Sequence, residues 1–121
     1  MILQDAIDEF ILDQRVRGNS QATIDYYSFA LNLFLTYFGY NSDVSDITLT
    51  LCKQYYVYLS EDKTVNSVSI QSYVRGLRTF LRWLYNNNYI EENICDKFKL
   101  PKATRKVIDI LSDQEIINLL I

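Results

Sequence analysis

Three arginines and a glutamine recur at helical spacing within residues 67–94. If this segment is a helix that turns by about 100° per residue, the four side chains share one narrow stripe. They are Gln71, Arg75, Arg78 and Arg82. Guanidinium and amide groups donate hydrogen bonds in fixed directions, which suits phosphate oxygens and base edges. One arginine alone is usually a solvated surface charge, but three on one stripe, followed by the basic run KFKLPKATRK, favour binding of a nucleic acid.

The opposite side of the same segment is apolar. Its residues recur every three or four positions: Ile70, Tyr73, Val74, Leu77, Phe80, Leu81 and Leu84. This spacing predicts a helix with one buried side. A helix with one buried and one cationic side is what a small DNA-binding domain lays against a duplex.

The charge of the chain is unevenly distributed. The net charge is −3, but residues 1–62 hold three basic and nine acidic side chains, whereas residues 63–106 hold nine basic and three acidic ones. The remaining residues add three acids. Because the local potential decides where a polyanion docks, the acidic total does not exclude double-stranded DNA as a partner.

The chain lacks the residues that catalysis and metal binding usually need. The chain has no histidine, no glycine-rich phosphate loop and no CxxC pair. General-base, nucleophilic-triad and zinc chemistry usually need an imidazole. We therefore predict no catalysis, no cofactor and no metal ion in this chain, and we interpret Cys52 and Cys95 as reduced, packed thiols.

The sequence also bears on localisation. No apolar run approaches the roughly 18 uncharged residues that a membrane span needs. The N-terminus, MILQDAIDEF, carries acidic residues where a signal peptide carries positive charge. We expect a cytoplasmic protein, nucleoid-associated when bound to DNA, with no membrane partner.

Periodic apolar residues predict an all-α domain of four main helices. We expect the first at Leu3–Val16, ended by Gly18 and Asn19, and the second at Gln21–Phe38, capped by Ser20 and ended by Gly39. The third opens at residues 46–48 and runs through Leu59, and the fourth runs from Ser67 to an asparagine turn at 86–88, after which Tyr89 and Ile90 fold back onto the core.

Pro101 divides the chain, because a Leu-Pro step disfavours helix. Ser112 and Glu115 form a capping box that opens a new helix, whose apolar side we expect to belong to an absent domain. We predict a DNA-binding domain at 1–96, a basic linker at 97–111, and the truncated first helix of a catalytic domain at 112–121.

The order of these signals resembles the N-terminal core-binding, or SAM-like, domain of tyrosine recombinases of the phage and transposon integrase family. The match in the second helix consists of Ser20, Thr23, Tyr27, Leu31 and Phe34. That in the fourth helix and its turn consists of Leu77, Arg78, Phe80, Trp83, Leu84, Ile90 and Asn93. The match in the tail consists of Leu111, Ser112 and Glu115. Two departures concern local turns: Ile94 stands where the family usually has proline, and the fourth helix lacks the threonine common near its start.

The resemblance implies two helical hairpins packed crosswise, which form one half of a C-shaped clamp around duplex DNA. It also implies that recombination is carried out by a C-terminal domain with catalytic Arg, Lys, His and Tyr. We therefore expect this fragment not to be an enzyme, although its parent would be a tyrosine recombinase. The implied partners are double-stranded DNA and other recombinase protomers, and we expect the isolated fragment to be monomeric.

The candidate DNA-binding residues fall into four groups. At the start of the second helix they are Ser20, Gln21 and Thr23, and at the start of the fourth they are Ser67, Ser69, Gln71 and Ser72. The arginine stripe contributes Arg75, Arg78 and Arg82, and the linker contributes Lys99, Lys102, Arg105 and Lys106. Ser20 is equally interpreted as an N-cap alone, Gln71 and Ser72 as ordinary surface residues, and Tyr27 and Trp83 as packing residues.

Two rival functions stay open. A helical protein-interaction module could use the acidic first helix, with Asp5, Asp8, Glu9 and Asp13, and the apolar terminus. A free-standing repressor is disfavoured by the truncated helix after the linker. Salt dependence separates DNA binding from apolar protein contact, because only the former weakens steeply as salt rises.

Overall fold

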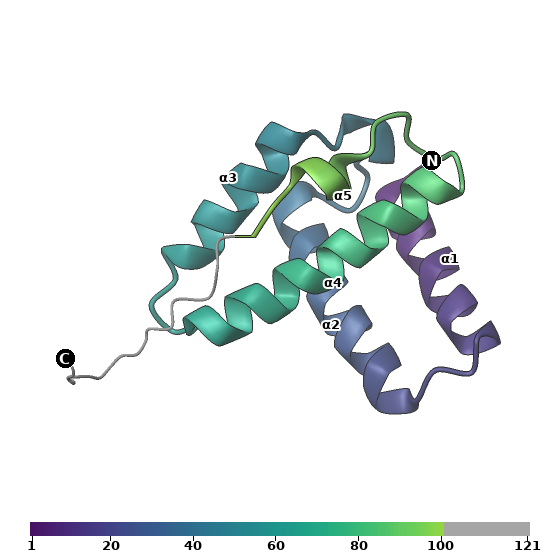
Figure 1. The fold of residues 1–121 in the computed structure, drawn as a ribbon, viewed down its shortest axis with the longest axis horizontal. Helices are drawn as coiled ribbons and strands as arrows, with labels where there is room; N and C mark the ends of the chain where they lie inside the picture. The colour runs from purple at the N-terminus through teal and green to yellow at the C-terminus, as the bar shows by residue number, and fades with distance from the viewer. Residues whose placement is uncertain (101–121) are drawn as a thin grey trace.

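The computed structural model describes residues 1–100, and within them the fold is all-α (Figure 1). The elements follow the chain in the order α1 (Leu3–Val16), α2 (Gln21–Phe38), η1 (Val44–Asp46), α3 (Leu49–Ser60), α4 (Ser67–Asn86) and α5 (Ile94–Lys97). Ile2 and Asp43 form one isolated antiparallel bridge in this part of the chain. The predicted helical class is confirmed.

Capping residues account for the helix bounds. Ser20 Oγ accepts a hydrogen bond from the Thr23 amide at 3.2 Å, which confirms the predicted N-cap of α2. Gly18 and Gly39 end α1 and α2 with φ of 79° and 116°, a backbone region that favours glycine. Both helices therefore have the predicted bounds.

The third helix opens at the end of the predicted range. We predicted that residues 46–48 open it; Thr48 is its N-cap and α3 begins at Leu49, while residues 44–46 form a separate 3-10 turn. The reason is local: Asp43 Oδ1 accepts from the Ser45 amide at 2.9 Å and so caps its own turn.

The helices form two hairpins that cross. Figure 1 shows α1 beside α2 in one hairpin, α3 joined to α4 in the other, and α4 lying across α2. Gly76 lies at the crossing, where an added Cβ would come within 3.2 Å of the Cβ of Ala30. Nearby, the Tyr26 hydroxyl donates to the backbone carbonyl of Ser72. The crosswise arrangement agrees with the fold that we expected.

Aromatic rings fill the space between α1, α2 and α4. Phe10 meets Phe80 and Trp83 edge-on, in each case with 5.5 Å between ring centroids, and meets Tyr27 at 5.2 Å. Phe10 and Phe80 are fully buried, and Trp83 is 7% exposed. The apolar side of α4 thus faces the core, as its spacing predicted, and leaves its polar stripe on the outside.

A short helix that we did not predict follows the asparagine turn. Asn93 caps α5, and Ile94, Cys95 and Phe98 are buried in the same core as α4. Packing therefore continues through Phe98, two residues beyond the domain boundary that we expected at residue 96. Ile90 is also buried and Tyr89 packs against the core, as predicted.

Candidate nucleic-acid interface

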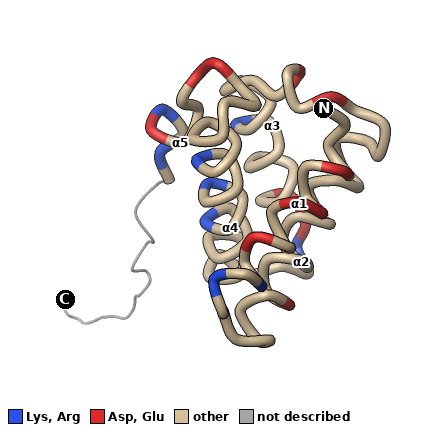
Figure 2. Tube along the Cα trace, turned by 90° about the vertical axis from the view of Figure 1, so that its right-hand side faces the viewer, with Lys and Arg blue, Asp and Glu red and all other residues tan. Residues whose placement is uncertain are grey.

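The outer side of α4 carries its arginines in a line. Arg75 and Arg82 are exposed, and Arg78 lies between them, half-buried. Figure 2 shows the basic segments of α4 stacked along one edge of the molecule, with those of α5 and the following residues beside them. We call the surface formed by Arg75, Arg78, Arg82, Lys97 and Lys99 the α4–α5 face.

Arg78 also contributes to the fold. Its Nη2 donates a hydrogen bond to the backbone carbonyl of Cys95 at 3.1 Å, and its Nε is buried without a partner among the described residues. Arg78 lies on the predicted polar stripe, and its guanidinium also holds α5 against α4. Arg78 lines a surface hollow, together with Asp96, Lys99 and Leu100.

The other cations of the α4–α5 face differ in their partners. Arg82 Nη2 lies 3.8 Å from Asp96 Oδ1, and Lys97 Nζ lies 2.7 Å from Glu92 Oε2. All four side chains are at least half exposed, so these ion pairs are weak and easily exchanged for another anion. Arg75 and Lys99 have no ion-pair partner within residues 1–100.

The start of α4 is capped by a residue that we overlooked. Asn66 Oδ1 accepts from the Ser69 amide at 2.8 Å, so Asn66 is the N-cap, and the helix begins at Ser67 as predicted. An asparagine just before an apolar period is a known start signal and could have been recognised. Ser67 is exposed, while Ser69, Gln71 and Ser72 are partly buried.

The candidate residues of α2 are engaged locally. Ser20 Oγ donates to Thr23 Oγ1 at 3.0 Å besides capping the helix, and Gln21 Nε2 donates to Asp25 Oδ1 at 2.8 Å. Figure 1 shows the starts of α2 and α4 at different ends of the crossing. The two groups of helix-start residues are therefore not brought together into one cluster.

Part of the predicted set lies outside the described residues. Lys102, Arg105 and Lys106, and the helix that we expected from Ser112 onward, belong to residues 101–121. Their contribution to DNA binding stays a prediction.

Figure 2 shows the acidic segments of α1 on another side of the molecule from the basic segments of α4. Two of these acidic residues accept hydrogen bonds from aromatic side chains. Trp83 Nε1 donates to Asp13 Oδ2 at 3.1 Å, and the Tyr89 hydroxyl donates to Glu9 Oε2 at 2.5 Å. The bond to Glu9 raises the pKa of Tyr89 above its ordinary value. Two of the four acids that we assigned to a rival protein-binding surface thus serve as acceptors within the fold.

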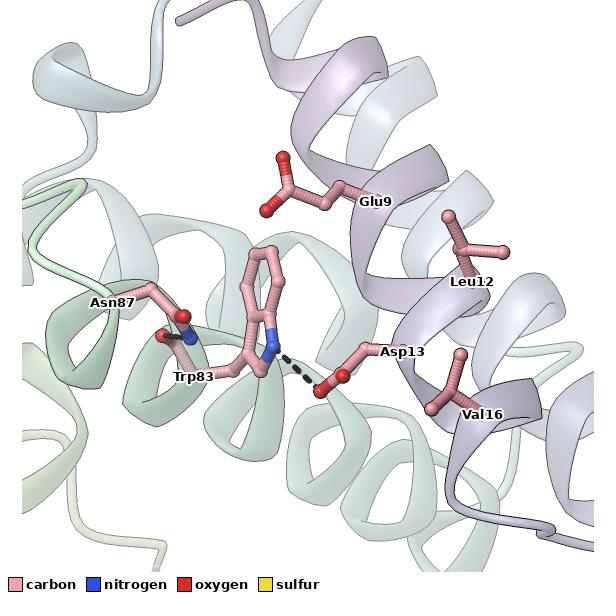
Figure 3. Close-up of a pocket in the computed structure, with 6 residues that line it drawn as sticks. All are labelled: Glu9, Leu12, Asp13, Val16, Trp83 and Asn87. Carbon is pink, nitrogen blue, oxygen red and sulfur yellow. Dashed lines mark hydrogen bonds between the residues drawn. The ribbon is translucent and has the colours of Figure 1, made fainter.

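A small pocket of about 160 Å³ lies between α1 and α4 at this place (Figure 3). Its lining consists of Glu9, Leu12, Asp13, Val16, Trp83 and Asn87. The indole edge points toward the carboxylate of Asp13, and Asn87 Nδ2 donates to the backbone carbonyl of Trp83 at 2.8 Å. The indole and the backbone carbonyl of Trp83 are thus both hydrogen-bonded, as expected for a packing residue.

Within residues 1–100 the structure also bears on metal binding, membrane spans and thiol chemistry. This part of the chain contains no group of three or more metal-ligating side chains. None of its helices combines the length and apolar character needed to cross a bilayer. Cys52 and Cys95 are free and buried, and burial raises the pKa of the Cys52 thiol to about 12, so that it stays protonated at neutral pH.

Comparison with known proteins identifies the family. The family model of the phage integrase SAM-like domain matches residues 3–100, almost the whole described fold. The chain therefore belongs to the phage integrase SAM-like domain family, as its motifs suggested.

Two curated relatives, each named tyrosine recombinase, support this assignment. One, from Thermosipho africanus, is 27% identical over 109 residues, and the other, from Pseudothermotoga lettingae, is 30% identical over 107 residues. Each match covers 87% of this chain but only 38% and 37% of the respective relative. The chain thus spans less than two fifths of the length of these relatives. No solved structure matches the chain.

Proposed function

We propose that this chain binds double-stranded DNA through the α4–α5 face, as the core-binding part of a tyrosine recombinase. The observation that carries the proposal is the line of arginines on α4, beside the lysines of and after α5, on a side of the molecule away from the acidic α1. Guanidinium groups in a row favour binding of a polyanion. Because the chain belongs to the phage integrase SAM-like domain family, we infer that this polyanion is DNA.

The spacing along α4 suits the backbone of a duplex. From Arg75 to Arg82 the helix rises roughly 10 Å, which exceeds the spacing of neighbouring phosphates on one strand, so the stripe can reach more than one phosphate. Arg75 and Arg82 are exposed and can contact these phosphates directly. Arg78, anchored to Cys95, would offer the remaining donors of a guanidinium that is already oriented.

The remaining groups extend the same surface. The DNA backbone would be contacted near the starts of two helices. At the start of α4 the contacting residues would be Ser67, Ser69, Gln71 and Ser72, and at the start of α2 they would be Ser20, Gln21 and Thr23. Lys99, followed by Lys102, Arg105 and Lys106, would follow the backbone beyond α5. Since these contacts are to phosphates, we expect little sequence preference.

The chemistry of recombination would lie in parts of a longer protein that this sequence does not include. The 121 residues contain no histidine, and the described tyrosines pack within the helical fold or on its surface. We propose that this part of the protein binds DNA and fixes the position of the recombinase along the duplex. We also propose that the protein acts in the cytoplasm. Its further partners would be other recombinase protomers on the same DNA.

Fluorescence anisotropy with a labelled duplex tests the proposal. We expect a Kd of about 1–100 μM at 50 mM salt, and a steep loss of affinity as salt rises. A protein-interaction module would give no such binding. If the chain shows a helical circular dichroism spectrum but no affinity for duplex at 50 mM salt, the proposal is wrong.

A further inference from the structure

Asp96 is the acidic residue of α5, and it lies within the α4–α5 face. Its Oδ1 is 3.8 Å from Arg82 Nη2, and it lines the surface hollow that Arg78 and Lys99 also line. Figure 2 shows the acidic segment of α5 directly beside basic segments. A carboxylate therefore stands among the cations that, under the proposed function, receive DNA phosphates.

The charge of Asp96 contributes little to the fold. The side chains of Asp96 and Arg82 are 65% and 59% exposed, and ion pairs this exposed stabilise proteins only slightly. Asp96 also accepts a hydrogen bond at Oδ2 from Asn93 Nδ2 at 2.8 Å, while its amide donates to Asn93 Oδ1. An asparagine at position 96 keeps a side-chain oxygen for the first of these bonds, and the second is donated by the backbone amide, which the substitution leaves in place, so neither requires the negative charge.

A carboxylate and a phosphate are equivalent ligands for a guanidinium, because both present charged oxygens to its N–H groups. Building on the proposed DNA binding, we propose that Asp96 is an internal competitor of DNA for Arg82. In the free chain its carboxylate holds the Arg82 guanidinium. In the complex a DNA phosphate binds the Arg82 guanidinium instead. The displaced Asp96 carboxylate then repels the negatively charged DNA backbone across the hollow. Asp96 thereby lowers the affinity of the α4–α5 face and makes release of DNA easier.

The test compares the DNA affinity of the 121-residue chain with that of Asp96→Asn by fluorescence anisotropy. We expect Asp96→Asn to bind a duplex about three- to tenfold more tightly at 50 mM salt, with a gain that shrinks as salt rises. The slope of log K against log salt should steepen by up to about one unit. Asp96→Ser, which is also neutral, should show the same gain, so that the result does not depend on one substitution.

The matched control is Asp8→Asn, which changes the net charge equally. Asp8 lies on α1, which is not part of the α4–α5 face, and is exposed with Gln4 as its hydrogen-bond partner. Asp8→Asn should change affinity by less than about twofold, because exposed charges farther apart than a Debye length are largely screened. Thermal melts by circular dichroism verify that each variant is folded.

A double-mutant cycle tests the route through Arg82. In an Arg82→Ala background, the gain from Asp96→Asn should fall toward that of the control. The inference is overturned if the parent chain binds DNA and the neutral variants at position 96 gain no more than Asp8→Asn, or if the full gain persists without Arg82. If none of these proteins binds DNA, the proposed function fails as well, and the two failures are thus distinguishable.

Discussion

Arg78 Nη2 donates a hydrogen bond to the backbone carbonyl of Cys95, which ties the middle of α4 to the one-turn helix α5 seventeen residues later. Arg82, one turn further along α4, reaches only an exposed carboxylate. Two arginines on one stripe therefore have different roles. One orients part of the proposed DNA-binding face, and the other is available to exchange its partner.

This difference predicts unequal effects of two substitutions on stability. Arg78→Ala leaves the carbonyl of buried Cys95 without its donor and should lower the free energy of unfolding by about 1–2 kcal/mol. Arg75→Ala, at an exposed position on the same helix, should stay within about 0.5 kcal/mol. Urea denaturation of both variants measures the two changes in the free energy of unfolding. Equal midpoints would mean that the Arg78 bond does not hold α5.

A second prediction concerns the bond between α1 and α4. Asp13→Ala removes the acceptor of the Trp83 indole and should cost about 1–2 kcal/mol, because the largely buried N–H loses its partner. Asp8→Ala, at an exposed position on the same helix where the carboxylate is bonded to Gln4, should cost less than about 0.5 kcal/mol. Urea denaturation curves of the two alanine variants measure both losses in the free energy of unfolding. Similar losses would show that the Trp83 bond adds nothing beyond helix propensity.

How far the fold could be predicted from sequence depended on whether its causes were local. The end of α1 and both ends of α2 follow from a cap or a glycine within one turn, so Ser20, Gly18 and Gly39 were sufficient signals there, whereas the start of α1 has no side-chain cap. The helix α5 is a single turn, too short to show a period. Its stability comes from burying Ile94 and Cys95 as it packs against α4, which is a tertiary contact that no local pattern marks.

The same distinction applies to the candidate site. Helical periodicity correctly placed Arg75 and Arg82 on an exposed surface. The anchoring of Arg78 could not be predicted, because its partner is a backbone carbonyl, which every residue has and no side-chain pattern marks. Asp96 likewise reaches Arg82 only because α5 packs beside α4.

The chain should lose stability in acid partly through Asp43. Hydrogen bonds from Ser45 and the neighbouring N-terminal ammonium lower the pKa of Asp43 from 3.8 to about 2. Because the folded pKa is below the unfolded one, this contribution is complete above pH of about 4 and is lost as pH falls toward 2.

Asp43→Asn should therefore lower the melting temperature at neutral pH and flatten its decline between pH 4 and about 2. Thermal melts of parent and variant across this range measure the effect. A pH dependence identical in both proteins would contradict the role assigned to Asp43.

Ser20 offers a way to separate capping from DNA contact. Ser20→Asp keeps a side-chain oxygen that can accept from the Thr23 amide, so stability should change by less than about 0.5 kcal/mol. If Ser20 also lies near a phosphate, the added negative charge should weaken DNA binding about threefold or more at low salt. Unchanged affinity would mean that Ser20 is an N-cap only.

The central claim is that DNA contacts the α4–α5 face, and an NMR titration of the isotope-labelled chain with a short duplex tests it most directly. We predict that amide shifts will change most along residues 75–82 and at Asp96, Lys97 and Lys99, and least on the acidic outer side of α1. The changes should reverse when salt is raised. Changes centred on α1, or changes that persist at high salt, would contradict the proposed interface.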